Sequence, residues 1–345
     1  MLLTDRPTPV RLTAPSPRRI WAGLIVLYIA WGSTYPAMRV ALRTLPPVFL
    51  LSARCALAAV ALGAICAARR AERPTWRQVR GAAVVGWLVL GLGHGLTTWS
   101  MQHTASGVAA VLGSLVPVWM ALTGWAVLGQ RPMRRELQGL AIGLVGLAVV
   151  ASATAHGASS GKALIALAIA PAAWAAGSAL SLRIATPVDA LVSTTVQLLA
   201  TAPVLLLVGL AGGEQHRLPA HWSSTTLLSF TYVTVIGYVV GFAIYTWLLR
   251  AAPLTWLGTY AYVNPLLAVV LGVVLLGEPL GATTLVGSAI VLAGVALVAT
   301  RTPWAAEAGA AHPVDGVAPE PARPEPDPMR SISMARSPDP IEAEA

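Results

Sequence analysis

The sequence predicts an all-α integral membrane protein of ten transmembrane helices, arranged as two inverted five-helix repeats. Three observations predict this fold: an apolar composition, ten apolar runs of membrane-spanning length, and an internal repeat at a fixed offset. Of the 345 residues, 56% are hydrophobic and only 11% are charged, whereas a soluble globular protein carries about 25% charged residues. Most of the surface must therefore face lipid.

The ten apolar runs give the predicted spans. A bilayer core about 30 Å thick requires about 20 apolar residues in each helix. The runs cover residues 20–38, 47–68, 80–102, 105–128, 137–154, 163–183, 189–211, 225–249, 254–277 and 282–300. The fourth is the least distinct, because only a few residues separate it from the third. The Pro/Arg-rich residues 1–19 and the Pro/Ala/Glu-rich residues 301–345 hold too little apolar surface to offset the entropy of ordering, so we expect disordered tails.

The distribution of basic residues predicts the orientation. Cytoplasmic segments of membrane proteins carry an excess of Lys and Arg. With the N-terminus in the cytoplasm, the inside segments hold 15 basic residues and the outside segments hold 4. We therefore expect a multi-pass protein of a bacterial inner membrane with both termini cytoplasmic. The same scatter of arginines argues against nucleic-acid binding, which would gather them on one soluble face.

The two halves of the chain resemble each other at an offset of 148 residues, without a gap. The matching residues are Thr98-Trp99 and Thr246-Trp247, Pro117 and Pro265, Leu128-Gly129 and Leu276-Gly277, Gly139 and Gly287, and Gly146 and Gly294. Near the starts of the halves, Ala30-Trp31 matches Ala173-Trp174 at an offset of 143. Each half has an odd number of spans, so the second repeat (163–300) enters the membrane opposite to the first (20–154). Transporters built this way hold their substrate near the midplane, between the halves.

Several short motifs resemble the EamA type of the drug/metabolite transporter superfamily, over roughly residues 20–300. They are Ala30-Trp31-Gly32-Ser33, Ser52-Ala53-Arg54, Leu276-Gly277-Glu278-Pro279-Leu280 and its first-half copy Leu128-Gly129-Gln130-Arg131-Pro132. The first-half copy has Gln130 where the family usually has glutamate, so any role of that acid survives in one half only. The resemblance implies a ten-helix basket working by alternating access, with members that export amino acids and related metabolites.

These features predict a secondary-active transporter that exports amino acids or related small polar metabolites. The alternatives are a cation-drug efflux protein, a membrane-embedded enzyme and a channel. Asp189, Glu214 and Glu278 all lie near span ends, which disfavours a carrier of cationic drugs with a carboxylate in mid-membrane. The sequence also lacks a zinc-site or nucleophile motif, polar rings and a Walker A motif. We expect a small-molecule substrate and the lipid bilayer as partners, and no catalytic residue, metal or cofactor; a homodimer is left open.

Two prolines and an asparagine are the first candidates for the substrate site. Pro117 and Pro265 occupy equivalent mid-span positions, and a proline inside a helix frees the carbonyl of the fourth residue before it. Such carbonyls can line a substrate cavity, or the kinks can serve packing alone. Asn264 is the only asparagine of the chain, with Tyr260 one turn away on the same helix face. Its buried amide binds either the substrate or a neighbouring helix.

Aromatic residues form the second group of candidates. A stripe on the eighth span comprises Tyr238, Phe242 and Tyr245, and its repeat mates on the third span are Leu90, His94 and Thr97. Such a stripe is either core packing or cavity lining, and the histidine among the mates favours the cavity. His94 is then either a hydrogen-bonded structural residue or a proton carrier. Trp31 and Tyr35 of the first span, with Trp174 of the sixth, predict an aromatic cage.

Arg54 and Glu278 are the candidate gating residues. An arginine at a helix centre costs ~2.5–3.5 kcal/mol on insertion scales, and Arg54 lies ~10 Å below the predicted outer boundary at helical rise. Glu278 falls at the outer end of its own span. Arg54 either snorkels to lipid headgroups, forms an ion pair, or contacts a substrate carboxylate. We predict that it pairs with Glu278 at an outer gate.

Overall fold

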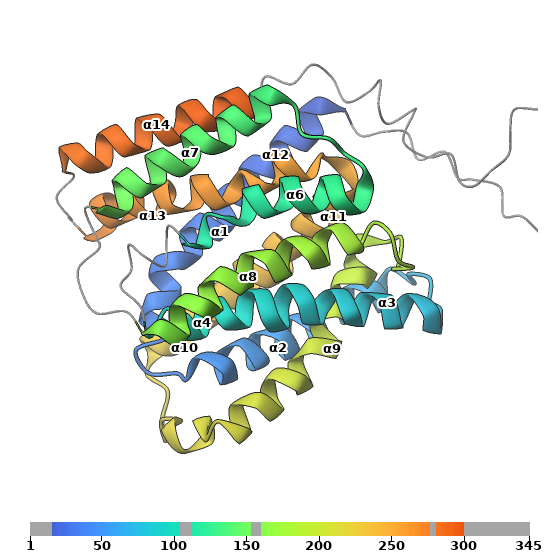
Figure 1. Ribbon diagram of the computed structural model, residues 1–345. Helices are drawn as coiled ribbons and strands as arrows, with labels where there is room; N and C mark the ends of the chain where they lie inside the picture. The colour runs from blue at the N-terminus through green and yellow to red at the C-terminus, as the bar shows by residue number, and fades with distance from the viewer. Residues whose placement is uncertain (1–15, 104–111, 153–159, 277–280, 300–345) are drawn as a thin grey trace, which may run out of the picture. The chain divides into compact units, whose positions relative to one another are not determined.

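The computed structural model describes residues 16–103, 112–152, 160–276 and 281–299, all within one compact unit of the chain, Met1–Trp304. The helices in this part of the chain fall into ten stretches (Figure 1). The first half contains α1 (Pro17–Ala41), α2 (Pro47–Ala68), the run α3–η1–α4 (Trp76–Gly86, Trp87–His94, Gly95–Ser100), α6 (Val116–Leu128) and α7 (Arg134–Ser152). The second half contains α8 (Gly161–Leu180), α9 (Ala190–Ala211), the run α10–η3–α11 (Ser224–Thr234, Val235–Phe242, Ala243–Ala251), the run α12–α13 (Leu254–Gly258, Tyr260–Leu276) and α14 (Ala282–Ala299). A short 3-10 helix, η2 (Glu214–Arg217), precedes α10.

Each stretch overlaps one predicted span. Within the described residues, six helices or helical runs are long and apolar enough to cross a bilayer, namely α1, α2, α3–η1–α4, α8, α9 and α10–η3–α11, and α6 and α14 are shorter apolar helices. The chain is therefore an all-helical membrane protein. α1 begins at Pro17 and so takes in the end of the predicted tail, whereas α6 begins only at Val116. Residues 1–15 and 301–345 of the predicted tails, and 105–111 of the fourth span, lie outside the described residues.

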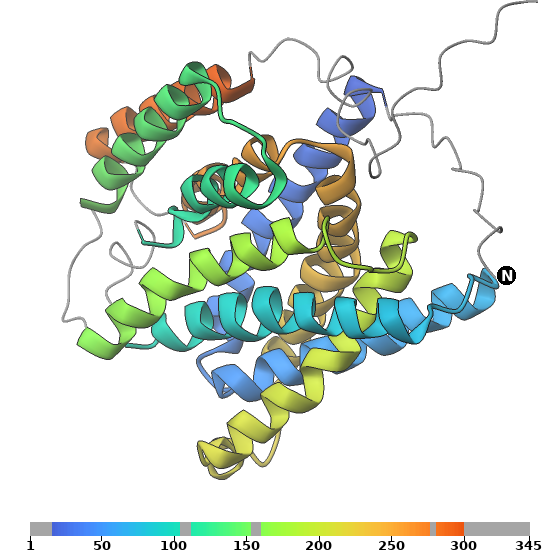
Figure 2. The ribbon, with the colours of Figure 1, turned by 45° about the vertical axis from the view of Figure 1, so that its right-hand side comes forward.

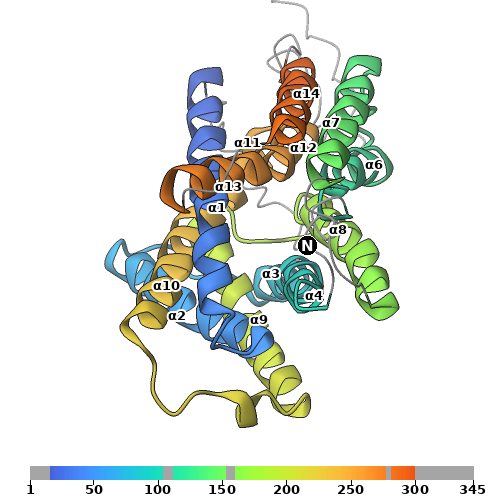
Figure 3. The ribbon, with the colours of Figure 1, turned by 90° about the vertical axis from the view of Figure 1, so that its left-hand side faces the viewer.

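The helices pack across the two halves in matched pairs. α1 packs on α13 and on η3, and its second-half counterpart α8 packs on α6 and on η1. α2 packs on α9, and α7 packs on α14, so each of these helices meets its own counterpart (Figures 1 and 2). Figure 3 shows α1 running beside α10 and α13, which belong to the other half. Matched pairing of this kind indicates duplicated halves.

Glycines allow the backbones of α7 and α14 to come into direct contact. A Cβ on Gly146 would lie 2.8 Å from the carbonyl oxygen of Gly287, and a Cβ on Gly139 would lie 2.7 Å from that of Gly294. Small residues serve this purpose in membrane helix pairs, where close van der Waals packing drives association. The four glycines are the two pairs related by the repeat, so the internal symmetry extends to this interface.

The third and eighth spans each contain a π-helical segment at equivalent positions. The segments are η1 (Trp87–His94) and η3 (Val235–Phe242), and both of their ends differ by the repeat offset of 148. In a π-helix the backbone hydrogen bonds join residues five apart instead of four, which widens the helix, and such segments occur frequently at functional sites. Both segments face helices of the opposite half, η1 against α8 and η3 against α1 and α2.

One buried carboxylate ties the halves together at the start of α2. This helix begins at Pro47 without a side-chain cap. Glu214 supplies the missing acceptors, because its carboxylate accepts hydrogen bonds from Val48 N at 3.3 Å and from Phe49 N at 2.7 Å. Arg217 pairs with the same carboxylate at 3.3 Å. An acid at a helix N-terminus is favourable because the free N–H groups carry partial positive charge, so a residue of the second half caps a helix of the first.

Candidate functional site

A cluster of aromatic rings lies where both halves meet, and Trp31 is at its centre. The centroid of the Trp31 ring lies 4.7 Å from that of Tyr260, 5.2 Å from Tyr245, 5.7 Å from Trp174 and 6.3 Å from Phe242. These residues come from α1, α8, η3, α11 and α13. Ring pairs at such separations attract each other beyond simple burial. We refer to these five residues as the aromatic cluster.

Each tryptophan of the cluster sits against a glycine of the opposite half. The indole ring of Trp31 occupies the space that a side chain on Gly241 would need, and Trp31 Nε1 donates a hydrogen bond to Gly237 O at 2.9 Å. Trp174 lies in the same way against Gly93, the repeat mate of Gly241. Both glycines belong to π-helical segments. The two tryptophans are therefore equivalent residues, and each packs where a glycine of the opposite half lacks a side chain.

The second tryptophan has a different hydrogen-bond partner from the first. Trp174 Nε1 donates to the hydroxyl oxygen of Tyr245 at 2.7 Å, and the Ser178 hydroxyl lies 2.6 Å from the same oxygen. The Ser178 hydroxyl also donates to Trp174 O at 2.7 Å. These three side chains are almost fully buried. A closed polar network of this kind fixes the geometry of the rings around it.

A chain of three further residues extends from the cluster through the π-helical segments. The His94 ring lies 6.2 Å from the Trp174 ring, and its Nδ1 is 3.1 Å from the Tyr238 hydroxyl. On the other side of Tyr238, the Arg54 guanidinium carbon lies 4.0 Å from the ring centroid, a cation–π distance. The structure thus brings together Trp31, His94, Trp174, Tyr238 and Tyr260 of the predicted site. It places Arg54 beside them and not at lipid headgroups.

Asn264 connects two helices in this structure. With its amide oriented to donate, Asn264 Nδ2 lies 3.2 Å from Tyr260 O and 3.3 Å from Tyr28 O, so it ties α13 to α1. Of the two interpretations of this amide, the contact with a neighbouring helix is the one for which the structure shows hydrogen-bond partners. The side chain is 2% exposed.

The two prolines differ in their positions. Pro117 lies in the first turn of α6, directly after the helix break at Ser114–Leu115, and is buried against Gly258. The fixed φ of proline and its missing N–H suit a first helical turn. Pro265 lies inside α13 as predicted.

Tyr35 is close in sequence to the cluster but is 43% exposed. Ile25 and Ile29 mark the outer, lipid-facing stripe of α1, with 51% and 57% exposure. At 3.6 residues per turn, Tyr35 lies about 120° around the helix from Ile29, so its exposed surface does not belong to that stripe.

Glu278, the predicted partner of Arg54, lies outside the described residues.

Three parts of the site were not among the predicted site residues. Phe242 and Tyr245 belong to the aromatic stripe of the eighth span, and Ser178 follows Tyr35 by the repeat offset of 143. Applying both offsets to every candidate would have found Ser178. No signal in the sequence marks the π-helical segments, because their hydrogen bonding depends on what packs against them.

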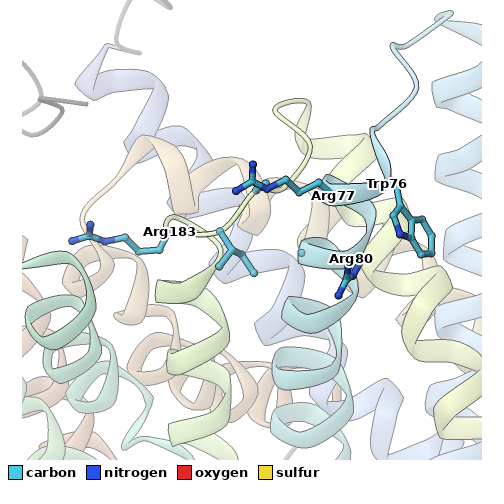
Figure 4. A pocket seen from close by; sticks show the side chains of 7 residues that line it. Trp76, Arg77, Arg80 and Arg183 are labelled. Atoms are coloured by element: carbon cyan, nitrogen blue, oxygen red, sulfur yellow. The ribbon is translucent and has the colours of Figure 1, made fainter. Parts of the chain in front are cut away.

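A separate pocket lies at the start of α3, away from the aromatic cluster. It has a volume of ≈ 470 Å³, and its lining residues are Trp76, Arg77, Arg80, Gly81, Arg183, Ile184 and Ala185. Figure 4 shows three arginine side chains around it, two from the first turns of α3 and one from the segment after α8. Gly81 allows this segment to approach, since a side chain there would collide with Ala185 O. These arginines are among those that predict a cytoplasmic location.

Comparison with known proteins identifies the family. The chain matches the EamA-like transporter family twice, over residues 19–152 and 161–300. It is 31% identical over 280 residues to the uncharacterized inner membrane transporter YedA of Escherichia coli K12, covering 81% of this chain and 90% of that protein.

Two other relatives have names that mention amino acids. One is the probable terminal-alkyne amino-acid exporter of Streptantibioticus cattleyicolor, 28% identical over 83% of this chain and 94% of that protein. The other is the probable amino-acid metabolite efflux pump of Salmonella typhimurium, 29% identical over 79% and 91%.

A solved crystal structure shares the fold. It superposes with a TM-score of 0.66 at 23% identity, covering 83% of this chain and 97% of that chain. Both halves of the sequence thus match one family, and the helices have a known arrangement. The chain therefore belongs to the EamA-like transporter family of the drug/metabolite transporter superfamily, and it is a membrane transporter and not an enzyme.

Proposed function

We propose that this transporter is a secondary-active exporter of amino acids or related small polar metabolites, working by alternating access. In this proposal ten helices cross the inner membrane as two inverted five-helix repeats, residues 20–154 and 163–300, with both termini cytoplasmic. Support comes from the 15-to-4 distribution of basic residues, from the matched packing of the halves, and from relatives named as a probable terminal-alkyne amino-acid exporter and a probable amino-acid metabolite efflux pump.

The single observation that carries the proposal is the aromatic cluster between the halves. Trp31 and Trp174 are repeat mates, and their rings meet at 5.7 Å. An ammonium group is attracted to the faces of such rings, so a zwitterionic amino acid suits the cluster. The rings are packed together here, and the substrate would separate them when it enters. The exposed Tyr35, one turn beyond Trp31, lies on the path.

A carrier of cationic drugs fits the described residues less well. Among the described residues two acids are buried, and both lie at helix ends with protein partners. Glu214 caps α2, and Glu136 accepts from Met133 N at 2.9 Å and from the Thr255 hydroxyl at 3.0 Å. Neither faces the aromatic cluster.

The gate remains a proposal that involves a residue outside the described part of the chain. Arg54 would pair with Glu278 when the outer side is closed, and a guanidinium can hold a carboxylate through two parallel hydrogen bonds. A double-mutant cycle on Arg54 and Glu278 measures this coupling. Additive effects on transport would reject the pairing.

Transport in proteoliposomes tests the proposed function. Purified full-length protein is reconstituted and screened with labelled amino acids, with and without a pH gradient. We expect saturable uptake that unlabelled substrate on the opposite side accelerates, since a carrier shows counterflow and a channel does not. Trp31→Ala should lower this transport about tenfold or more, given the size of the ring contacts it removes. Uptake that does not saturate, or that is the same in empty liposomes, would reject the proposal.

A further inference from the structure

Arg54 is a buried cation whose hydrogen-bonding capacity is only partly used. It is 3% exposed. Its Nη2 donates to Val233 O at 2.8 Å, and its Nη1 lies 3.8 Å from the sulfur of Met38. Its Nε is buried without a partner among the described residues. A guanidinium has more N–H donors than these two acceptors occupy, and a thioether sulfur is a weak acceptor.

Arg250 of the same protein differs from Arg54, because oxygen atoms of the protein accept hydrogen bonds from both of its terminal nitrogens. Its Nη1 donates to Val188 O at 2.8 Å, and its Nη2 donates to Thr186 Oγ1 and Pro187 O at 2.8 and 2.7 Å. Three oxygen acceptors therefore surround an arginine that is less buried than Arg54. The contrast indicates that the acceptors among the described residues do not by themselves satisfy Arg54.

No ion pair of Arg54 exists within the described residues, where the ion pairs join Arg69 to Asp189 and Arg217 to Glu214. A buried charge without a counter-charge is costly, and such residues within membrane spans mark substrate or ion pathways. The Tyr238 ring does not balance the positive charge of the Arg54 guanidinium, because the attraction of a ring for a cation is modest. The missing partner is therefore an anion.

The position of Arg54 places this anion next to the aromatic cluster. A side chain on Gly237 would lie 2.9 Å from Arg54 Nη2, and the carbonyl of the same glycine accepts the hydrogen bond from Trp31. Arg54 and Trp31 thus flank one residue of η3. The residue 143 positions after Arg54 is Gln197, which donates to the Ser193 hydroxyl at 3.1 Å. Only one half carries the cation, so one anionic group is accommodated.

We propose that Arg54 is the anion subsite of the transport site and binds the carboxylate of a monocarboxylic substrate. This inference rests on the proposed function and narrows its substrate class. The carboxylate would accept from Nε and from a remaining N–H of the guanidinium, while the rest of the substrate lies against the aromatic cluster. Charge-assisted hydrogen bonds of this kind are stronger than the hydrogen bonds that a neutral amide would accept from the same guanidinium.

A binding measurement on the purified full-length protein tests this subsite without requiring transport. The probes are phenylacetate and phenylacetamide, which share a ring and a shape and differ in charge, and binding is read from the shift in thermal unfolding. We expect the acid to bind about ten- to hundredfold more tightly than the amide. Arg54→Gln should bring this ratio to about one. Arg250→Gln, the matched control, should lower the unfolding temperature and leave the ratio unchanged.

Each other outcome would overturn the inference. Equal binding of acid and amide by the wild type, no binding of the acid, or an unchanged ratio in Arg54→Gln would do so. Acid preference that appears only in Glu278→Gln would show that Glu278 occupies the guanidinium, which makes it a gate and not a subsite.

If Arg54→Gln does not fold, Arg54→Lys decides, because it keeps the charge but loses the fork. A ratio reduced severalfold supports the subsite, and an unchanged one rejects it. A protein that binds the acid in this way but shows no counterflow would contradict the proposed function alone.

Discussion

The Tyr245 hydroxyl joins two elements of the site at the scale of a single residue. It accepts the indole N–H of Trp174 and contacts Ser178, so it holds α8 against α11. The ring of the same residue stacks beside Trp31. Removing only the hydroxyl would leave the Trp174 N–H buried without an acceptor, and such a group costs about 1–3 kcal/mol.

We therefore expect Tyr245→Phe to impair transport while the protein still folds. The rings would remain, but Trp174 would lose the hydrogen bond that fixes its orientation. Tyr262→Phe is the matched control, because the Tyr262 hydroxyl is equally buried and donates to Leu140 O at 3.0 Å outside the cluster. Thermal unfolding should fall in both variants, and counterflow should fall severalfold only in Tyr245→Phe. Equal loss of counterflow in the two variants would show that the Tyr245 hydroxyl supports the fold and not the site.

At the scale of elements, hydrogen bonds between helices of the two halves hold the site together. The continuous run α10–η3 receives two donors from the first half, with Arg54 on Val233 O of α10 and Trp31 on Gly237 O of η3. These carbonyls lie one turn apart, and the second is within the widened helix. In contrast, Trp174 donates to Tyr245 and not to a carbonyl of η1. The two equivalent segments are therefore docked differently.

The α7–α14 interface should tolerate no added side-chain volume. A Cβ on Gly287 would lie 2.8 Å from Gly146 O and 2.7 Å from a methyl group of Val150, so Gly287→Ala must push the helices apart. Overpacking of this kind costs about 1–3 kcal/mol. Gly281→Ala is the control, because no atom lies within 4 Å of its Cβ position. Unfolding in detergent should occur at a lower temperature for Gly287→Ala only, and identical unfolding of the two variants would contradict this packing.

The fold of the whole molecule was largely predictable from the sequence, because lipid imposes helices and the repeat relates their order. Hydropathy located the stretches, and the offsets of 148 and 143 identified Trp31 and Trp174 as mates. What the sequence left open depended on tertiary contacts. Pro117 follows a helix break at Ser114–Leu115, which hydropathy alone does not locate. Asn264 finds its partners on α1, and no pattern within its own helix could reveal them. The π-helical segments lie where tryptophans of the opposite half pack against Gly93 and Gly241, a contact between distant spans that hydropathy does not report.

A substrate site between the two halves requires that the halves be inverted, and the loops that follow the second and seventh spans test this inversion. These loops are equivalent in the repeat, so inversion requires them to lie on opposite sides of the membrane. Paired alkaline phosphatase and fluorescent-protein fusions are placed after Glu72 and after Gln215, with a third pair after Arg301. We predict that the fusion after Gln215 reads periplasmic and that the fusions after Glu72 and Arg301 read cytoplasmic. If Glu72 and Gln215 read on the same side, the halves are not inverted, and a substrate site between them loses its basis.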